Sequence, residues 1–266
     1  MRQWLQDAAT KTVDAAAAIT PRAVPQAVAL RNCKVIAHRG AHDRNRMIEN
    51  TLPAFTTASA AGVWGIECDI RWTADLVPII HHDPTCQRLF GDPARLAALN
   101  YSEIRERLPL IPTLAEVIEE LGGRTHLMLE IKEDYYPREQ QQKAILRDLL
   151  RPLLPGRDYH FLLLDPALAR YVDFLPREFC FLVAQLNVSQ LSKHCLEQGF
   201  GGLTGHFLLL NEQLKRRHAD QGQGMGTGFI SSRNALFREL NRGIDWIFSN
   251  DAVKIQKIRD QYLTRG

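Results

Sequence analysis

The sequence predicts an α/β protein folded as a (β/α)8 TIM barrel. Short apolar runs alternate along the chain with segments of helical period, a pattern typical of parallel strands joined by helices. Eight such units can be counted, and the 266 residues are close to the roughly 250 over which these barrels run as one domain. A doubly wound open sheet is the alternative, because periodicity alone does not show closure.

Each unit combines one predicted strand with one predicted helix. The strands are expected at residues 33–37, 65–70, 126–131, 159–164, 179–184, 202–206, 225–230 and 245–248. The helices are expected at residues 52–61, 114–121, 139–150, 167–174, 190–198, 212–219, 235–241 and 252–262. Residues 31–266 are therefore assigned to the barrel domain, and residues 1–30 to an N-terminal helical extension, with an extra amphipathic helix over 3–19, packed on it.

A ninth apolar run, at residues 77–80, follows the second strand too closely to be parallel to it. Only six residues separate it from Ile70, whereas a parallel crossover needs about a dozen or more. We therefore expect a β-hairpin extension after strand 2 that turns at residues 73–75 and returns the chain to the rim at His82. Residues 84–112 are rich in proline and glycine, and we expect them to cross the barrel mouth with one helical stretch at 102–108.

Composition excludes several classes of protein. The 33 basic and 30 acidic residues are dispersed, so the net charge of +3 does not predict a nucleic-acid partner. No apolar stretch approaches the roughly 20 residues that span a bilayer, and polar residues interrupt the N-terminus where a signal peptide would be apolar. The five cysteines show no Cys-x-x-Cys spacing, so reduced thiols and a cytoplasmic location are expected. The N-terminal segment leaves peripheral membrane contact open, and the sequence does not determine the oligomeric state.

The first predicted strand ends abruptly in His38, Arg39 and Gly40. Active sites of these barrels lie at the C-terminal ends of the strands, so polar residues there have functional weight. An imidazole transfers protons near neutral pH, a guanidinium binds phosphate through two hydrogen bonds, and glycine permits a tight turn. A strand-end histidine beside a solvated arginine is the alternative.

The second strand places two carboxylates on one face. Because side chains alternate along a strand, Glu67 and Asp69 point to the same side. Facing the barrel interior they require a cation, and hard oxygen ligands favour Mg²⁺, Ca²⁺ or Mn²⁺. If this face is instead at the sheet edge, the two carboxylates are solvated.

The third predicted strand ends in Glu130 followed by Lys132, again on one face. Glu130 would be a third carboxylate ligand, and Lys132 would contact the same phosphate as Arg39 or pair with Glu130. The hairpin returns His82 toward this rim, and its neighbour His81 is expected to point the other way. Two imidazoles beside a cation would supply the acid and base that cleavage of a phosphodiester requires.

These residues form an ordered set that resembles the glycerophosphodiester phosphodiesterases. The matching motifs, strongest over residues 33–132, are His38-Arg39-Gly40, Glu49-Asn50-Thr51 with Ala54-Phe55, Glu67-Cys68-Asp69-Ile70, His82-Asp83-Pro84-Thr85 and Leu129-Glu130-Ile131-Lys132. The resemblance implies a barrel, and a small-molecule phosphodiester substrate cleaved to glycerol 3-phosphate and an alcohol. It implies catalytic His38 and His82, phosphate contacts from Arg39 and Lys132, and one divalent cation held by Glu67, Asp69 and Glu130. Glu49 is similar to a glutamate that braces the motif arginine, although it would equally suit the start of the following helix.

The C-terminal half departs from the family pattern. Residues 226–229 stand where the family usually has Trp-Thr-Val-Asn, and Ser249-Asn250 where it has Thr-Asp. These positions shape the alcohol pocket, so lysophospholipids are an alternative substrate, and a catalytically silent barrel that binds phosphorylated ligands is an alternative of another class. For Phe229, Phe207 and Trp246, packing in the core is expected ahead of lining the pocket.

Overall fold

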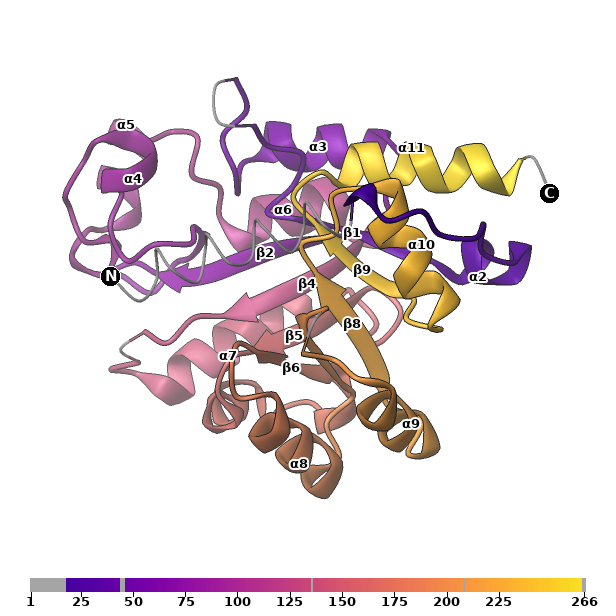
Figure 1. Ribbon diagram of the computed structural model, residues 1–266. Coiled ribbons are helices and arrows are strands. Elements are labelled where there is room, and N and C mark those ends of the chain that lie inside the picture. Colours follow the sequence, from indigo (N-terminus) through magenta and orange to yellow (C-terminus); the bar gives the residue numbers. More distant parts are fainter. Residues whose placement is uncertain (1–17, 44–45, 135, 208, 265–266) are drawn as a thin grey trace.

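The structure is a barrel of strands surrounded by helices (Figure 1). It is a computed structural model that describes residues 18–43, 46–134, 136–207 and 209–264. Within these residues the strands are β1 (Lys34–His38), β2 (Gly65–Trp72), β3 (Pro78–Ile80), β4 (His126–Ile131), β5 (Tyr159–Leu163), β6 (Cys180–Ala184), β7 (Gly202–His206), β8 (Gly224–Gly228) and β9 (Trp246–Ser249). The α-helices are α2 (Ala27–Asn32), α3 (Leu52–Ala60), α4 (Gln87–Phe90), α5 (Tyr101–Arg107), α6 (Leu114–Leu121), α7 (Glu139–Leu150), α8 (Val188–Gln198), α9 (Glu212–Asp220), α10 (Arg233–Asn241) and α11 (Ala252–Leu263).

The sheet closes on itself. β1 pairs in parallel with β2 on one side and with β9 on the other, and the remaining barrel strands follow in the order β8, β7, β6, β5, β4. Closure confirms the eight-stranded barrel and excludes the open sheet. The predicted strands, and all but one of the predicted helices, end within two residues of the observed elements.

The alternation of side chains along β1 separates two apolar clusters. Val35 and Ala37 belong to the large cluster between the strands and the surrounding helices, whereas Ile36 packs inside the barrel. The interior cluster is completed by bulky side chains from other strands, namely Met128, Leu162, Phe181, Trp246 and Phe248. The barrel interior is therefore a filled core, as is usual for this fold.

The hairpin after strand 2 is confirmed. β3 pairs antiparallel with the end of β2, with Ile70 opposite Ile80, and the turn is closed by a hydrogen bond from the Thr73 amide to the Val77 carbonyl. Beyond the hairpin, the buried guanidinium of Arg71 donates to the His82 carbonyl through Nε at 2.8 Å and Nη2 at 2.6 Å. The return of His82 to the rim is thus held by a side chain of β2 itself.

Residues 84–112 form an excursion at the end of β2 that carries α4 and α5 (Figure 1). The excursion has its own apolar cluster, made of Ile79 from the hairpin with Cys86, Leu96, Ile104, Leu108 and Ile111. Asn100 and Glu103 form a capping box at the start of α5. Because it carries a core of its own, the excursion is an ordered part of the rim.

One predicted helix has a different geometry. Residues 167–174 were expected to be α-helical, but Pro166–Val172 winds as a 3₁₀-helix, with the Asp165 carboxylate accepting from the Ala167 amide at 2.8 Å. A 3₁₀-helix rises about 2.0 Å per residue and an α-helix about 1.5 Å. The tighter winding therefore covers the path between β5 and β6 with few residues.

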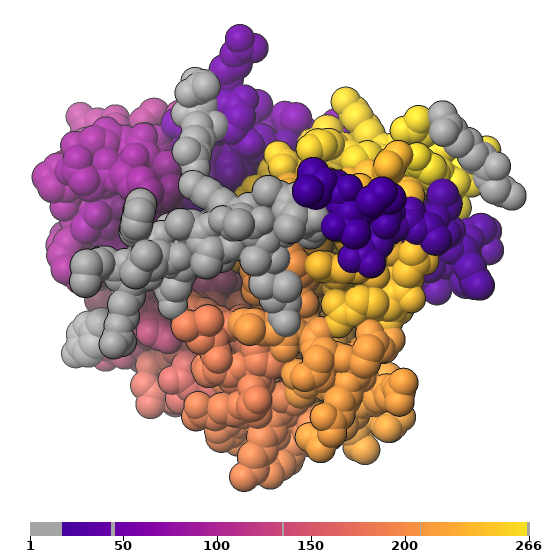
Figure 2. All heavy atoms as spheres, in the orientation of Figure 1, coloured from indigo at the N-terminus to yellow at the C-terminus, as the bar shows by residue number. Residues whose placement is uncertain are grey.

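The N-terminal helix predicted over residues 3–19 lies, apart from its last two residues, outside the described part of the chain. Residues 18–32 pack against the C-terminal helices (Figure 2). Asn234 and Asn241 of α10 donate side-chain hydrogen bonds to the carbonyls of Ala18 and Ala23, at 2.6 and 2.9 Å. α2 runs across the boundary predicted at residue 30, so the described part of the extension is bonded to the barrel.

Gly40 provides a test of how closely β1 approaches α3. Gly40 has φ +85°, and a Cβ placed on it would lie 2.9 Å from the Ala54 carbonyl carbon and from Phe55 Cδ1. Gly62 has a similar φ of +79°, but a Cβ there meets nothing within 4 Å. Gly62→Ala should therefore cost about 1 kcal/mol of backbone strain, and Gly40→Ala about 1–3 kcal/mol more because of the clash. Urea unfolding measures both, and equal losses would contradict the close approach.

Candidate active site

Strand register brings the predicted site residues together. In the parallel pairing of β1 with β2, His38 is the partner of Glu67, and in the pairing of β2 with β4, Asp69 is the partner of Glu130. One oxygen from each carboxylate lies within 4.8 Å of the other two, and all three residues are buried. Glu67 and Asp69 share one face of β2, and the register of β2 with β4 adds Glu130 from a distant part of the chain, so the three form one cluster, which we call the carboxylate cage.

The cage is held by side chains that donate to it. Lys132 contacts Asp69 Oδ1 at 2.7 Å and forms a short ion pair with Glu130 Oε1. Asn50 Nδ2 donates to Asp69 Oδ2 at 2.6 Å. Lys132 was expected either to contact a phosphate or to pair with Glu130, and the pair with Glu130 is present in the structure.

The charges within the cage do not balance. Glu67, Asp69 and Glu130 carry three negative charges when ionised, and Lys132 and Arg39 supply two positive ones. Burial, with the charges of Asp69 and Glu130 adding to it, raises the pKa of Glu67 well above its usual range. Burial opposes ionisation of Asp69 as well, but Lys132 and Arg39 hold the pKa of that carboxyl below its usual range.

The cage fits a hard divalent cation. Glu67 Oε1 is buried and has no hydrogen-bond partner among the described residues, which is costly for an ionised carboxylate. The available ligand atoms are carboxylate oxygens, the type that Mg²⁺, Ca²⁺ and Mn²⁺ prefer. A divalent cation bound by Glu67, Asp69 and Glu130 would satisfy the unpartnered oxygen and more than offset the one excess negative charge.

His38 is held in a defined orientation at the edge of the cage. Its Nδ1 lies 2.6 Å from Asn250 Oδ1, and its Nε2 lies 3.8 Å from Glu67 Oε2. Since an amide oxygen only accepts, Nδ1 carries the proton and Nε2 presents a lone pair toward the cage. Burial, reinforced by the positive charge of Arg39, lowers the pKa of His38 to about 4.

His82 has a different kind of partner. Its Nδ1 lies 2.7 Å from the Asp83 carboxylate, while Arg71 holds its carbonyl. Burial lowers the pKa of His82, and the opposing carboxylates of Asp69 and Asp83 limit that effect. His81 is buried and its ring lies against that of Phe90, with ring centroids 6.1 Å apart.

Arg39 is braced by two carboxylates. Its Nη1 donates to Glu49 Oε1 at 2.8 Å, and its Nε lies 3.3 Å from Asp69 Oδ2. The N-terminus of α3, which Glu49 was alternatively expected to cap, is capped by Thr51 instead. The Thr51 hydroxyl accepts a hydrogen bond from the Ala54 amide. The guanidinium is thereby fixed at the rim beside the cage.

Several contacts of this site were not predicted from the sequence. Asn250 orients His38, Arg71 anchors His82, and Arg88 of α4 contacts both Glu49 and Asp83. Asn250 follows the last predicted strand by two residues and was expected at the rim, where it was assigned to the alcohol pocket and not to His38. Arg71 and Arg88 offered no comparable signal, because their partners are set by the return of the hairpin and the path of the excursion.

The expectation of core packing is wrong for one of the three aromatic residues. Phe207 and Trp246 are buried, but Phe229 is 45% exposed at the end of β8. Its ring centroid lies 5.9 Å from that of His38 in an edge-on arrangement, and its φ is +65°. A bulky residue in this backbone region is strained, and such strain is common at functional sites. The cause of the difference is that β8 ends at Gly228 and turns the next side chain outward.

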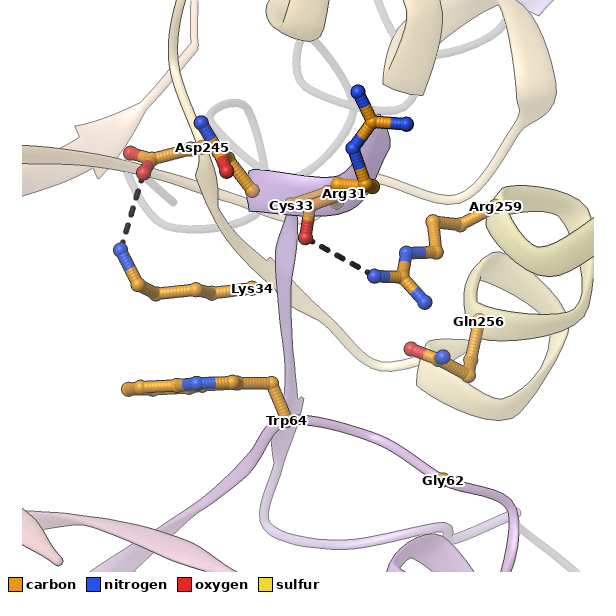
Figure 3. A pocket seen from close by; sticks show the side chains of 9 residues that line it. Arg31, Cys33, Lys34, Gly62, Trp64, Asp245, Gln256 and Arg259 are labelled. Atoms are coloured by element: carbon orange, nitrogen blue, oxygen red, sulfur yellow. Dashed lines mark hydrogen bonds and ion pairs between the residues drawn. The ribbon is translucent and has the colours of Figure 1, made fainter. Parts of the chain in front are cut away.

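A pocket of about 450 Å³ lies at the opposite end of the barrel, where β1 and β9 begin (Figure 3). Lys34 pairs with Asp245 at 3.1 Å above Trp64, and Arg259 donates to the Leu30 carbonyl at 2.8 Å. These cations already hold neighbouring segments together. The N-terminal end of such barrels generally contributes to stability, which agrees with these contacts.

A protein-family model for the glycerophosphoryl diester phosphodiesterase family matches residues 38–172, just over half of the chain. The chain belongs to this family. The match contains the whole carboxylate cage, both rim histidines and Arg39. It ends before β6, so the strands that carry Phe229 and Asn250 lie outside it.

Individual relatives match part of the chain. Glycerophosphodiester phosphodiesterase 1 of Bos taurus is 33% identical over 125 residues, 41% of this chain and 37% of that protein. A glycerophosphodiester phosphodiesterase of Caldanaerobacter subterraneus is 35% identical over 130 residues, 42% of this chain and 51% of that protein. The matches thus span between about a third and a half of these curated relatives' length.

Solved structures match over most of the chain. An Oleispira antarctica phosphodiesterase in complex with the product sn-glycerol-3-phosphate has a TM-score of 0.74 at 23% identity, covering 87% of this chain and 99% of that one. A structure from Silicibacter pomeroyi described as a glycerophosphoryl diester phosphodiesterase has a TM-score of 0.73 at 23% identity, covering 92% and 96%. They show the shared fold. None of the helices in the described residues is both long and apolar enough to span a membrane.

If the cage binds a divalent cation, the cation should stabilise the folded protein. At a concentration 100 times the Kd, binding contributes about 2.7 kcal/mol, which raises Tm by several degrees in a chain of this size. Glu67→Gln should lose this shift, because it removes a cage charge, whereas Glu119→Gln on the exposed face of α6 should retain it. Thermal unfolding with and without Mg²⁺, Ca²⁺ or Mn²⁺ measures the shift. A shift of the same size in both variants would place the cation elsewhere.

Proposed function

We propose that the protein hydrolyses glycerophosphodiesters to glycerol 3-phosphate and an alcohol. The observation that carries the proposal is the meeting of two oriented imidazoles, a braced guanidinium and the carboxylate cage at one rim of the barrel. Membership of the phosphodiesterase family supports it. The product named in the Oleispira antarctica complex, sn-glycerol-3-phosphate, supports glycerol as the retained group.

The two histidines are suited to different halves of the reaction. His38 donates Nδ1–H to a neutral amide, so its Nε2 is available to take a proton from the attacking oxygen. His82 is bonded to the Asp83 carboxylate, which stabilises an imidazolium and suits donation of a proton to the leaving alkoxide. In this assignment, a P–O bond to the nucleophile forms, the P–O bond to the alcohol breaks, and the alcohol leaves with the proton from His82.

Arg39 and Lys132 are proposed to orient the phosphate. The planar guanidinium of Arg39, fixed by Glu49 and Asp69, matches the oxygens of a phosphodiester. Lys132, placed between Asp69 and Glu130, adds positive charge at the inner side. A divalent cation held by Glu67, Asp69 and Glu130 would neutralise charge on the phosphoryl oxygens.

Metal removal tests the proposed function most directly. EDTA should abolish hydrolysis of glycerophosphocholine, and added Mg²⁺, Ca²⁺ or Mn²⁺ should restore it, because the buried cage is left with excess negative charge otherwise. Release of glycerol 3-phosphate measures the activity. Unchanged hydrolysis in EDTA would exclude the metal requirement. Binding of phosphate esters without turnover across a metal-supplemented panel would favour the silent, ligand-binding barrel.

Replacement of either histidine should remove most of the activity. His38→Ala and His82→Ala are each expected to lower kcat by about 10²- to 10⁴-fold, the usual contribution of a general acid or base. His194→Ala, on the outer helix α8 and bonded to Gln198, is the matched control and should keep wild-type rates. Full activity in both rim variants would refute the assigned roles. Detection of a cyclic phosphate product would show that a substrate hydroxyl attacks first.

The second candidate substrate is a lysophospholipid, and the exposed ring of Phe229 beside His38 is the observation that favours it. An apolar surface at the rim suits a substrate with an acyl chain. If lysophospholipids are used, the protein should turn over lysophosphatidylcholine at a rate comparable with that for glycerophosphocholine. Phe229→Asn should then lower the turnover of lysophosphatidylcholine and leave that of glycerophosphocholine unchanged. Asn tolerates positive φ, so this variant keeps the backbone. Absence of lysolipid turnover would remove this candidate.

A further inference from the structure

Arg88 of α4 binds two carboxylates with opposite edges of its guanidinium. Nε contacts Asp83 Oδ2 at 2.5 Å, while Nη1 and Nη2 contact the two oxygens of Glu49 at 3.1 and 2.6 Å. The two carboxylates come from different segments: Asp83 ends the hairpin, and Glu49 precedes α3. One side chain of the excursion therefore joins two separate parts of the rim.

Each of these carboxylates also holds one residue of the site. Asp83 Oδ1 lies 2.7 Å from His82 Nδ1, and Glu49 Oε1 accepts from Arg39 Nη1 at 2.8 Å. The contacts run without interruption from His82 through Asp83, Arg88 and Glu49 to Arg39. The imidazole and the phosphate contact are thus connected through a single guanidinium that touches neither of them.

The guanidinium is suited to this position in a way that lysine is not. Its rigid planar fork presents donors along two edges at once, whereas an ammonium is a single point charge on a flexible stem. Arg88 and Arg39 lower the pKa of Glu49 to about 2 despite its burial, so Glu49 remains a charged acceptor. Arg88 also lowers the pKa of Asp83 against the effect of burial.

The segment that carries Arg88 is anchored on both sides. Cys86 at the start of α4 is fully buried in the excursion's own cluster, and Phe90 at its end packs against the buried His81. α4 is therefore a fixed support for the Arg88 side chain, although 45% of that side chain is exposed.

We propose that Arg88 is a positioning residue that fixes His82 and Arg39 relative to each other through Asp83 and Glu49. This rests on the proposed function, since both residues are assigned to phosphodiester cleavage there. Exposed ion pairs contribute little to folding, so the effect of Arg88 should be on turnover and not on stability.

Arg107 provides the matched control. It lies in the same excursion, pairs with Asp92 at 2.5 Å, and its side chain is 43% exposed, close to the value for Arg88. It contacts none of the site residues. Arg88→Lys and Arg88→Ala should lower kcat by about 10- to 100-fold, the range typical of residues that orient others, while Arg107→Ala keeps the wild-type rate. Guanidinium ion added to Arg88→Ala should restore part of the loss, and Arg88→Lys covers the case in which Arg88→Ala does not fold.

A double-mutant cycle distinguishes positioning from general weakening. Asp83→Asn and Glu49→Gln should each lower kcat in the wild-type background and lower it less in Arg88→Lys, because the part of each effect that depends on Arg88 is already lost there, while the direct contacts with His82 and Arg39 remain. Full additivity, or wild-type turnover in Arg88→Lys, would overturn the proposal while leaving the phosphodiesterase function intact.

A measurement that does not depend on catalysis tests the positioning role of Arg88 separately from the proposed phosphodiesterase function. The ¹⁵N NMR signals of His82, assigned by their loss in His82→Ala, should report a proton on Nδ1 in the wild type and in Arg107→Ala. They should shift toward a mixture of tautomers in Arg88→Lys, where Asp83 is no longer held. If the wild type fails to cleave any phosphodiester, the proposed function fails, and the tautomer shift still tests the connection. Identical His82 signals in all three proteins would overturn it.

Discussion

The burial of three carboxylates at one end of a filled barrel is the constraint on which the rest of the site depends. The register of the adjacent strands β2 and β4 holds the three carboxylates close together, with one oxygen of each within 4.8 Å of the others. The residues are Glu67, Asp69 and Glu130. Ionised groups of like charge in such a place are costly unless cations and donors surround them. Lys132, Arg39 and Asn50 meet part of that requirement, and a divalent cation would meet the remainder.

The same requirement explains why the surrounding side chains are themselves braced. Arg39 faces Asp69 in a fixed orientation because Glu49 holds its other edge. Glu49 in turn is shared with Arg88, whose second partner is Asp83. Charges of alternating sign thus extend from the buried cage to the exposed rim, and each member limits the orientations open to the next.

The hairpin and the excursion add what the eight strands cannot provide. Parallel strands deliver their C-terminal residues to one rim, which accounts for His38 and the cage, but His82 does not belong to a barrel strand. It reaches the rim because β3 returns antiparallel along β2 and because Arg71 holds the His82 carbonyl. The excursion then places α4 so that Arg88 contacts both Asp83, after the hairpin, and Glu49, before α3.

Sequence alone determined the eight strand and helix units, the hairpin and the residues of the cage, because these follow from local periodicity, from the shortness of one connection and from the alternation of side chains along a strand. Closure of the sheet was decided by the pairing of β1 with β9. Sequence could assign neither 3₁₀ winding after β5 nor the outward turn of Phe229, since both depend on the distances and packing between neighbouring elements. The contacts of Asn250, Arg71 and Arg88 were decided by the tertiary structure. Each joins segments remote in the chain, and barrel closure, hairpin return and the excursion's own core set which side chains meet.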